Sequence, residues 1–375
     1  MFIDPYLQTL LIITAVLTAI IMALLAIMLI SRLLTSLNRQ KYKLKTQQWE
    51  DLYLNYLHGD LSLEETAGLM EGEKPYWLWQ FFAPYLDVLA GSDFEKTKTL
   101  CREIGLIDYY KKKLHRGRTV GKATAARVLG ALRCRESVSE MLNLLQSKNP
   151  ILVQAAAQGL AKSGKTETFF TTAQALLGNT FFTYKGATEI LAGFGENICP
   201  QIARYLEKES GRLPAVGQGQ NIKSPKETPR KNTVNATDYR SIMIDLLGFF
   251  KYRQALPLLE RLLEKADEET TVHILKAFIN MKEVPANLDL KSYLEHRYWT
   301  VRNFSARAWQ LTGDRQALPV LEKLLSDRNW WVRYNAAEAL RSAGQPGLEI
   351  LEQNTAEADQ AAASISSYAL SRSEV

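Results

Sequence analysis

Histidine, the side chain most often used for acid–base catalysis and metal binding, is rare and scattered in this sequence. The four histidines, His58, His115, His273 and His296, form no HExxH motif and no pair spaced i, i+4. No GxxxxGK[ST] phosphate loop and no GxSxG nucleophile motif occurs. The acidic pairs Glu64–Glu65 and Glu268–Glu269 are adjacent in sequence and fit solvated helix ends. The sequence therefore predicts no catalytic residue, no metal site and no cofactor.

The cysteines also argue against chemistry. Cys101, Cys134 and Cys199 are far apart and odd in number, and no CxxC motif occurs. A disulfide framework is not expected, and we predict three small core residues in a reducing compartment.

Aromatic and arginine side chains gather towards the C-terminal end of the chain. The set comprises Tyr298, Trp299, Arg302, Arg307, Trp330, Trp331, Arg333 and Tyr334. Exposed Trp, Tyr and Arg dominate the energetics of protein interfaces, so these residues predict a protein-binding groove. The alternative is that several of the rings fill the core between helices. Because adjacent residues cannot both point inward, we expect one of Trp330 and Trp331 in the core and the other at the groove.

A basic cluster forms a second candidate surface. It consists of Lys111, Lys112, Lys113, Arg116, Arg118 and Lys122. One interpretation is contact with anionic lipid headgroups or an acidic partner. The other is a solvated helix end and loop favoured by the helix dipole. The sequence does not decide between them.

The elements that would position these residues repeat with a period of 31. Residues 317–325 read ALPVLEKLL, and residues 255–263, two periods earlier, read ALPLLERLL. Val301-Arg302 and Val332-Arg333 are one period apart, as are Gly313 and Gly344. Each period holds a leucine-rich helix and then an alanine-rich helix. A single pair cannot bury its apolar face alone, so stacked pairs sharing a continuous core are expected.

Smaller features support the helix pairs. The paired alanines would allow close helix approach, the glycine ending each period suits a residue with positive φ, and the Pro of ALP suits a first helical turn. The second helices are expected to start near Val120, Ile151, Tyr184, Tyr239, Val272, Val301 and Val332, the first belonging to an incomplete pair.

The pattern ALPxLxxLLxDxxxxVRxxAAxALxxxG at 317–344 resembles the HEAT-like repeat of phycobilin lyases. The resemblance implies an all-α fold in which a HEAT-like α-solenoid of about six helix pairs covers residues 117–345. It also implies that Asp327 and Arg333 belong to a ladder of ion pairs between repeats and are not catalytic. His296 stands where the motif has Asp, which puts one rung of the ladder in question.

The sequence divides into six predicted segments. They are a transmembrane anchor at 1–35, a helical juxtamembrane and N-terminal cap region at 36–115, repeats at 116–206, a disordered insertion at 207–237, repeats at 238–345, and a C-terminal cap and tail at 346–375. The insertion is rich in Gly, Pro, Lys, Asn and Thr. Its Ser224-Pro225 and Thr228-Pro229 would suit a docking or phosphorylation segment, but such dipeptides are common by chance.

The N-terminal segment is long and apolar. Residues 7–30 hold no charge, and 24 residues of helix reach about 36 Å, enough to cross a bilayer core of about 30 Å. Arg32, Arg39, Lys41, Lys43 and Lys45 follow it, and no basic residue precedes it. The positive-inside rule then predicts a single-pass cell-membrane protein with its N-terminus outside and its repeats in the cytoplasm.

These five charges account for most of the net charge of +6, which leaves 41 basic and 40 acidic residues elsewhere. A nearly neutral domain does not favour nucleic-acid binding.

Between the anchor and the repeats we expect one helix continuing to about Gly59 and three short helices near 63–70, 76–89 and 93–104. The aromatic segment 75–91 could lie in the membrane interface. We favour packing as an N-terminal cap, because Pro84 interrupts the segment and it carries no basic face.

The function that fits best is a non-enzymatic, membrane-anchored scaffold that binds another protein. The layout is similar to that of bacterial membrane-anchored HEAT-repeat proteins, which implies a partner such as a membrane glycosyltransferase. A bilin-lyase-like repeat enzyme is the alternative implied by the same resemblance, although those substrates are soluble. A nucleic-acid-binding helical-repeat protein is the weaker alternative. Membrane lipids, through the anchor, are the other expected partner.

Overall fold

The computed structural model describes residues 5–210, 236–286, 288–356 and 359–372. These residues contain helices and no strand, so the all-α prediction is confirmed. The chain divides into two compact units, residues 1–113 and 114–375, which are described separately. The predicted insertion falls mostly outside the described residues, together with its Ser-Pro and Thr-Pro dipeptides.

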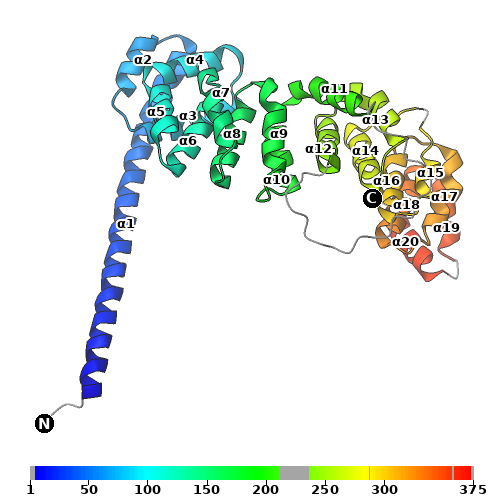
Figure 1. Ribbon diagram of the computed structural model, residues 1–375. Coiled ribbons are helices and arrows are strands. Elements are labelled where there is room, and N and C mark those ends of the chain that lie inside the picture. Colours follow the sequence, from blue (N-terminus) through cyan, green and yellow to red (C-terminus); the bar gives the residue numbers. More distant parts are fainter. Residues whose placement is uncertain (1–4, 211–235, 287, 357–358, 373–375) are drawn as a thin grey trace. The chain divides into compact units, whose positions relative to one another are not determined.

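Unit 1 begins with one helix of 54 residues, α1 (Pro5–His58), which runs unbroken through residue 35 (Figure 1). Side chains from Ile13 to Lys41 are exposed along its length. Its most apolar 18-residue window has a mean hydropathy of 2.9, and none of that window is buried. By length and composition the helix could cross a membrane.

Four shorter helices follow α1: α2 (Leu63–Met70), α3 (Pro75–Val88), α4 (Gly91–Glu103) and α5 (Leu106–Arg116). The first three confirm the short helices predicted there. Trp49 and Tyr53 of α1 are buried against Phe81 and Phe82 of α3 in edge-to-face contacts. The middle of the aromatic segment therefore packs on α1 within unit 1, and its packing against the first repeat as a cap stays a prediction.

The expectation that Pro84 interrupts this segment is wrong. Pro84 lies inside α3, four residues before its end. Pro removes one backbone hydrogen bond and strains the preceding turn. The burial of Phe81 and Phe82 on one side of Pro84 and of Leu86 on the other keeps the helix on α1 despite that cost.

Unit 2 is built from helix pairs that follow one another in sequence. The first helices are α7 (Val138–Leu145), α9 (Phe169–Leu177), α11 (Cys199–Ser210), α13 (Leu256–Leu263), α15 (Lys291–Leu294), α17 (Leu318–Leu324) and α19 (Gln345–Asn354). The second helices are α6 (Thr119–Ala131), α8 (Pro150–Lys162), α10 (Tyr184–Ala192), α12 (Ala236–Phe249), α14 (Glu268–Met281), α16 (Trp299–Trp309), α18 (Trp330–Ser342) and α20 (Gln360–Ser371). Each second helix packs on the next, from α6 to α20. The predicted starts of seven of them are confirmed to within four residues.

The period is visible in the backbone as well. A residue with positive φ follows each second helix from α6 to α18, at 31-residue intervals within two groups: Arg133, Gly164 and Gly195, then Lys251, Lys282, Gly313 and Gly344. The gap from Gly195 to Lys251 exceeds one period by the length of the segment 211–235. The predicted role of the period-end glycine is confirmed, and the insertion is an addition to a repeat of normal length.

Close approach of the second helices depends on residues without large side chains. A Cβ atom on Gly130 of α6 would lie 2.3 Å from the backbone oxygen of Gly159 in α8. Gly248 of α12 faces Ala277 of α14 in the same way, with 2.7 Å between a Cβ and the Ala277 Cα. The two contacts occupy equivalent repeat positions, so both parts of unit 2 use one packing arrangement.

Other expectations are also settled. Pro257 and Pro319 lie in the first turns of α13 and α17, as the ALP pattern predicts. The three cysteines are buried and free, and burial raises the pKa of the Cys199 thiol to about 12. The region assigned to a C-terminal cap holds a further helix pair, α19 and α20, which packs on α18.

Candidate protein-binding surface

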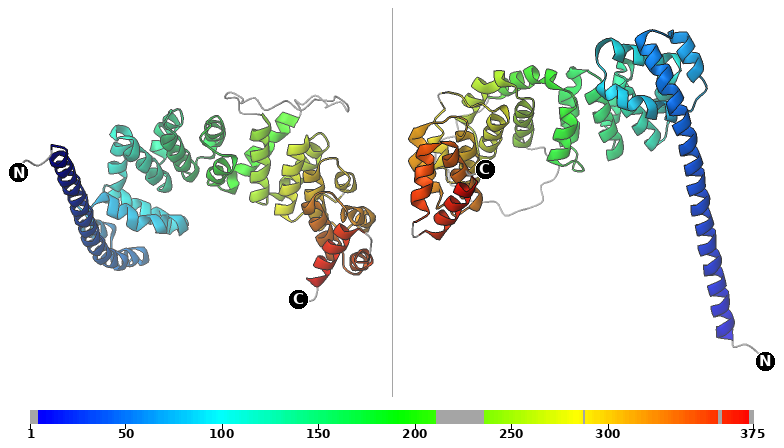
Figure 2. Two further views of the ribbon diagram at one scale, coloured as in Figure 1. Left: turned by 90° about the horizontal axis from the view of Figure 1, so that it is seen from below. Right: turned by 180° about the vertical axis from the view of Figure 1, so that it is seen from behind.

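The aromatic residues of the predicted set lie at the starts of α16 and α18. These helices belong to the yellow-to-orange part of the ribbon in Figure 2. Trp330 and Trp331 are the first two residues of α18 and are 48% and 56% exposed. The expectation that one of them is a core residue is therefore wrong. The inward positions of α18 begin at Val332, and both tryptophans precede it in the first turn of the helix.

The two tryptophans belong to a larger group of rings, which we call the C-terminal aromatic cluster: Trp330, Trp331, Tyr334 and Tyr368. Trp330 stacks on Tyr334 with centroids 5.2 Å apart and contacts Trp331 edge-on at 4.8 Å. Tyr334 contacts Tyr368 of α20 at 6.1 Å. Mutual ring contacts of this kind restrict side-chain rotation, so the cluster is pre-organised.

Arg372 completes the edge of this cluster. Its guanidinium lies 6.0 Å from the Tyr368 ring and donates a hydrogen bond of 3.1 Å to the Tyr334 hydroxyl. It also lies 3.5 Å from Glu338, which pairs with Arg341 at 2.8 Å. Tyr368 and Arg372 were absent from the predicted set because their region was assigned to a cap, although Tyr368 follows Tyr334 by about one period.

The predicted residues on and next to α16 differ in exposure and in the rings or cations that they contact. Tyr298 and Trp299 are 37% and 42% exposed, and Arg297 stacks over Tyr298 at 4.5 Å. Arg307 is exposed and lies over the ring of Phe304 at 5.4 Å. These residues extend an aromatic and basic surface along α16.

Arg302 and Arg333 make contacts within the protein. Arg302 holds Asp327 through two bonds, of 2.7 Å from Nε and 3.0 Å from Nη2, and its Nη1 donates to the carbonyls of His296 and Arg297. Arg333 repeats the second contact one period later, with Nη1 donating to the Asp327 carbonyl at 2.8 Å. Arg302 therefore ties α16 to the loop before α18, which is the inter-repeat role that the resemblance implies for the Asp and Arg of the motif.

The corresponding acid of the next repeat follows at nearly the same spacing. Asp359 stands about one period after Asp327 and caps α20 by accepting from the Ala361 amide. Hydrogen bonds from Ser326 and from the amide of Ala361, with a smaller contribution from the charge of Arg333, hold the pKa of Asp359 below its usual range.

His296 occupies the position of Asp in the preceding repeat. Its Nδ1 accepts from the Tyr298 amide at 3.3 Å, as Asp327 accepts from the amide of Asn329 at 2.8 Å. Burial and the cations Arg297 and Arg302 lower the pKa of His296, which favours the neutral ring that this bond needs. Thr271 stands one period before Arg302, so the preceding repeat has neither the Asp nor the Arg of the ladder. His296 keeps the bond from the Tyr298 amide within its loop.

A buried amide pair adds a second cross-repeat contact. Asn335 of α18 donates at 2.7 Å to the side-chain oxygen of Asn303 in α16 and at 2.9 Å to the carbonyl of Trp331. This pair holds the first turn of α18 against α16. Nothing in the residue pattern singles out these asparagines, because a polar residue on an alanine-rich helix face usually indicates solvent.

The predicted basic cluster is divided between the two units. Lys113, at the end of unit 1, lies 5.2 Å from the Tyr109 ring and 5.8 Å from the Tyr110 ring. The remaining members vary from half-buried to exposed: Lys111 and Lys122 are half-buried, and Lys112, Arg116 and Arg118 are exposed.

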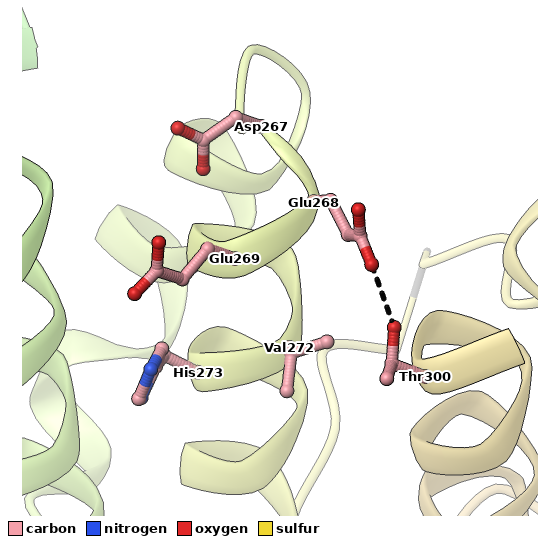
Figure 3. Close-up of a pocket in the computed structure, with 6 residues that line it drawn as sticks. All are labelled: Asp267, Glu268, Glu269, Val272, His273 and Thr300. Carbon is pink, nitrogen blue, oxygen red and sulfur yellow. Dashed lines mark hydrogen bonds between the residues drawn. The ribbon is translucent and has the colours of Figure 1, made fainter. Parts of the chain in front are cut away.

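An open pocket of about 510 Å³ lies at the start of α14 and was not predicted. Figure 3 shows Glu269 and His273 on one side of the helix and Glu268 on the other, where Thr300 donates to it at 2.9 Å. His273 bonds Asp245 of α12 at 2.7 Å, and Asp245 also accepts from Tyr184 of α10 at 2.7 Å.

This His–Asp pair has the arrangement of a base and the carboxylate that orients it, but the hydroxyl of Thr300 is engaged by Glu268. The bonds instead link three successive second helices. Among the described residues, no group of three His, Cys, Asp or Glu side chains is placed to hold a metal ion.

The C-terminal part of the chain can now be assigned to a class. Residues 287–370, which contain α15 to α19, all but the last residue of α20 and the whole C-terminal aromatic cluster, match the family model of HEAT repeats. The chain is therefore an all-α protein with HEAT repeats in this part.

Comparisons with whole proteins add little to that assignment. The chain is similar to the crystal structure of an engineered protein at 16% identity and a TM-score of 0.33, over 82% of this chain and 87% of the other. It is similar to human deoxyhypusine hydroxylase in complex with glycerol at 13% identity and a TM-score of 0.23, over 88% of this chain and 98% of the other. TM-scores this low carry no argument about function. No curated protein matched the chain.

Proposed function

We propose that the protein is a non-enzymatic, membrane-anchored scaffold whose HEAT repeats bind another protein through the C-terminal aromatic cluster. The observation that carries the proposal is the pair of adjacent tryptophans, 48% and 56% exposed, at the start of a helix fixed by neighbours on both sides. Large exposed aromatic side chains cost free energy in water, and they are the residues that contribute most when an interface forms.

The cluster is suited to binding because it is held in place before a partner arrives. Asn329 caps α18 by accepting from the Trp331 amide at 2.9 Å, and Tyr334 is fixed by Tyr368 and Arg372. Ordering a long side chain on binding costs about 0.5–1.5 kcal/mol, so prior order leaves more of the contact energy as affinity. Arg307 and Arg297 extend the surface with cations that can pair with a partner's carboxylates.

The anchor defines where this binding takes place. In the proposal, the apolar part of α1 crosses the cell membrane with the N-terminus outside, and the basic residues after it keep both units in the cytoplasm. Confinement to one membrane raises the effective concentration of a membrane partner, so a modest affinity is sufficient. The proposed partner class is a membrane enzyme, for which a glycosyltransferase is the candidate suggested by similarly organised proteins.

Affinity capture from gently solubilised membranes tests the binding part of the proposal. The variants Trp330→Ala and Trp331→Ala each remove an exposed anchor, and loss of a central interface residue costs about 2 kcal/mol or more, which is about thirtyfold in affinity. The matched control is Phe181→Ala, because Phe181 is 70% exposed and lies outside the cluster. Recovery of the same proteins by all three variants would rule out the cluster as the binding site.

A separate experiment tests the anchor. The full chain should resist extraction of membranes at alkaline pH, and a C-terminal tag should be accessible only after the cytoplasmic side is opened. Release of the chain at alkaline pH would show that α1 does not span the membrane.

A further inference from the structure

Positive charge is concentrated in the first part of unit 2. Residues 114–188 contain ten basic and three acidic residues, whereas the rest of the chain contains 36 basic and 37 acidic residues. The near balance of charge outside the anchor flank conceals this excess, because most of the acids lie elsewhere in the chain. The section runs from the end of α5 into α10 and belongs to one compact unit. Such an excess favours an anionic partner.

The second helices of this section start at one edge of the unit. Near their last turns, Gly130 of α6 faces Gly159 of α8. In the same way Gly193, which follows α10, faces Ala161 near the end of α8. Helices whose ends meet in this way run parallel. Figure 1 shows the three helices in the cyan-to-green part of the ribbon. Packed helices lie about 8–10 Å apart, so the starts of α6, α8 and α10 form a row about 20 Å long.

Each of the three starts exposes a large apolar side chain. Val120 and Ile151 are the second residues of α6 and α8, stand 31 residues apart, and are 74% and 50% exposed. Phe181, in the turn before α10, is 70% exposed. The buried positions of α6 and α8 begin later, at Ala123 and Val153. A single exposed apolar residue is ordinary, but its recurrence in three successive repeats makes an apolar row.

An exposed cation lies within four residues of each of these side chains: Arg118, Lys148 and Lys185. Arg118 and Lys148 make no hydrogen bond or ion pair with other residues in the described part of the chain. Lys185 lies 3.9 Å from Glu189, and both side chains are exposed, so this pair holds the lysine weakly. The sequence contains no acid in 116–135 or in 141–166.

We call this row the basic edge of unit 2: Arg118, Val120, Lys148, Ile151, Phe181 and Lys185. The opposite ends of the same helices differ in charge. There Lys165 pairs with Glu167 at 2.9 Å, and Glu136 stands in the turn after α6. Acids therefore accompany the cations at that end, whereas the loops of the basic edge contain none.

The combination of cations and aliphatic side chains indicates which anionic partner fits. A bilayer surface accepts both, because its headgroups attract Lys and Arg and its acyl boundary takes up apolar side chains. A nucleic acid pairs with cations through its phosphates and stacks its bases on aromatic rings. Val120 and Ile151 would find no such contact with a nucleic acid, so the basic edge fits a membrane better.

We propose that the basic edge of unit 2 rests on the anionic cytoplasmic surface of the membrane that α1 crosses. The inference rests on the proposed membrane anchor, which keeps the basic edge close to a bilayer. It assigns Arg118 of the predicted basic cluster to anionic lipid. It uses none of the C-terminal aromatic cluster, so the repeats would bind lipid and protein through different helices.

Spin labels report the depth of chosen residues in the full chain reconstituted into vesicles of phosphatidylcholine mixed with the anionic lipid phosphatidylglycerol. Single labels would be placed through Ile151→Cys, Phe249→Cys and Met22→Cys. Phe249 is 62% exposed and is the last residue of α12, at the opposite end of a second helix, so it is the matched control. Met22 is 62% exposed within the apolar part of α1. The native cysteines are buried, which keeps them from being labelled.

We expect the label at Ile151 to be at least about threefold less accessible to a water-soluble nickel complex than the label at Phe249. The label at Met22 should lie in the hydrocarbon. Equal accessibility of Ile151 and Phe249, with Met22 in the hydrocarbon, would overturn the membrane contact and leave the anchor intact; it would point to an acidic protein as the partner of the basic edge. A water-exposed label at Met22 would overturn the anchor and the membrane contact together.

The charge contribution is tested by reversing the three cations of the basic edge together: Arg118→Glu, Lys148→Glu and Lys185→Glu. Each basic residue near an anionic surface contributes about fivefold in membrane affinity, so this variant should make the Ile151 label as accessible as the Phe249 label. The matched control reverses three exposed lysines of later repeats: Lys265→Glu, Lys291→Glu and Lys323→Glu. It should leave the Ile151 label protected. An equal response to both variants, or equal protection in pure phosphatidylcholine, would overturn the contact with anionic lipid.

Discussion

Removal of the Arg302 side chain tests the ion-pair ladder that links the HEAT repeats. Arg302→Ala deletes both bonds to Asp327 and the two bonds to the carbonyls of His296 and Arg297. The Asp327 side chain, only 7% exposed, then loses the guanidinium that is paired with its carboxylate. The amide of Asn329 remains a donor to this carboxylate.

The size of the effect follows from this burial. Breaking a buried ion pair by removing one partner costs about 3–5 kcal/mol, whereas an exposed pair contributes about 0–1 kcal/mol. The Arg302 side chain is 17% exposed, so water can partly solvate the carboxylate left behind. We therefore expect the low end of the buried range, about 3 kcal/mol, which corresponds to a fall in Tm of about 6–12 °C for a cooperative unit of this size.

Chemical and thermal unfolding of the full chain in mild detergent, followed by circular dichroism, measures the loss. Arg307→Ala is the control, because Arg307 lies on the same helix, is exposed and contacts only the face of Phe304 among the contacts described above. It should cost less than about 1 kcal/mol. A cycle with Asp327→Ala should give a coupling energy of about 1.5–3 kcal/mol. Additive single effects, or equal losses in the two arginine variants, would refute the ladder as a stabilising contact.

Three further outcomes are expected from the same unfolding measurements. The pKa of His296 is lowered below 6.5 in the folded chain, so the folded state binds fewer protons than the unfolded one. The stability that neutral His296 contributes is therefore complete above pH 6.5 and is lost as the pH falls through the folded pKa. His296→Gln should reduce the loss of stability between pH 7.5 and 5.5, and an unchanged loss would contradict the neutral state assigned to this ring. Gly159→Ala would put a Cβ 2.4 Å from the backbone oxygen of Ala126 and should destabilise the chain by about 3 kcal/mol, while Gly68→Ala, which meets nothing within 4 Å, should be neutral or stabilising. Lys282→Gly should stabilise by about 0.5 kcal/mol, because Lys282 ends α14 with φ of 56°, and a loss of stability would show that this lysine side chain makes a needed contact.

The helix pairs could be predicted from the sequence because one signal was repeated many times. Each leucine-rich and alanine-rich helix is a weak indication alone, but the 31-residue spacing made them consistent with one another. The positive-φ positions were only partly visible. Gly164 and Gly344 marked the period end, whereas Lys251 and Lys282 adopt the same backbone conformation without the glycine that signals it.

The candidate surface was predicted less completely, for a physical reason. Residue type indicates that tryptophan and arginine suit an interface, but it does not show whether another part of the chain uses them first. Trp330 and Trp331 are exposed because they precede the first inward position of α18, whereas Arg302 is used inside the repeats by Asp327. Tyr368 was missed since its repeat lacks the ALP pattern that marked the others.

The ladder and the C-terminal aromatic cluster meet in the same loop, which connects stability to binding. Asp327 receives Arg302 from the repeat before it, and its side chain also accepts from the amide of Asn329, the residue that caps α18. The first turn of α18, which presents Trp330 and Trp331, is thus held by a contact from the neighbouring repeat. Asp327→Asn keeps the size of the side chain and both tryptophans but loses the charge that holds Arg302. If pre-organisation contributes to affinity, this variant should weaken partner binding through faster dissociation even at temperatures where the chain stays folded. Unchanged dissociation at full helix content would mean that the tryptophans bind without needing the turn to be rigid.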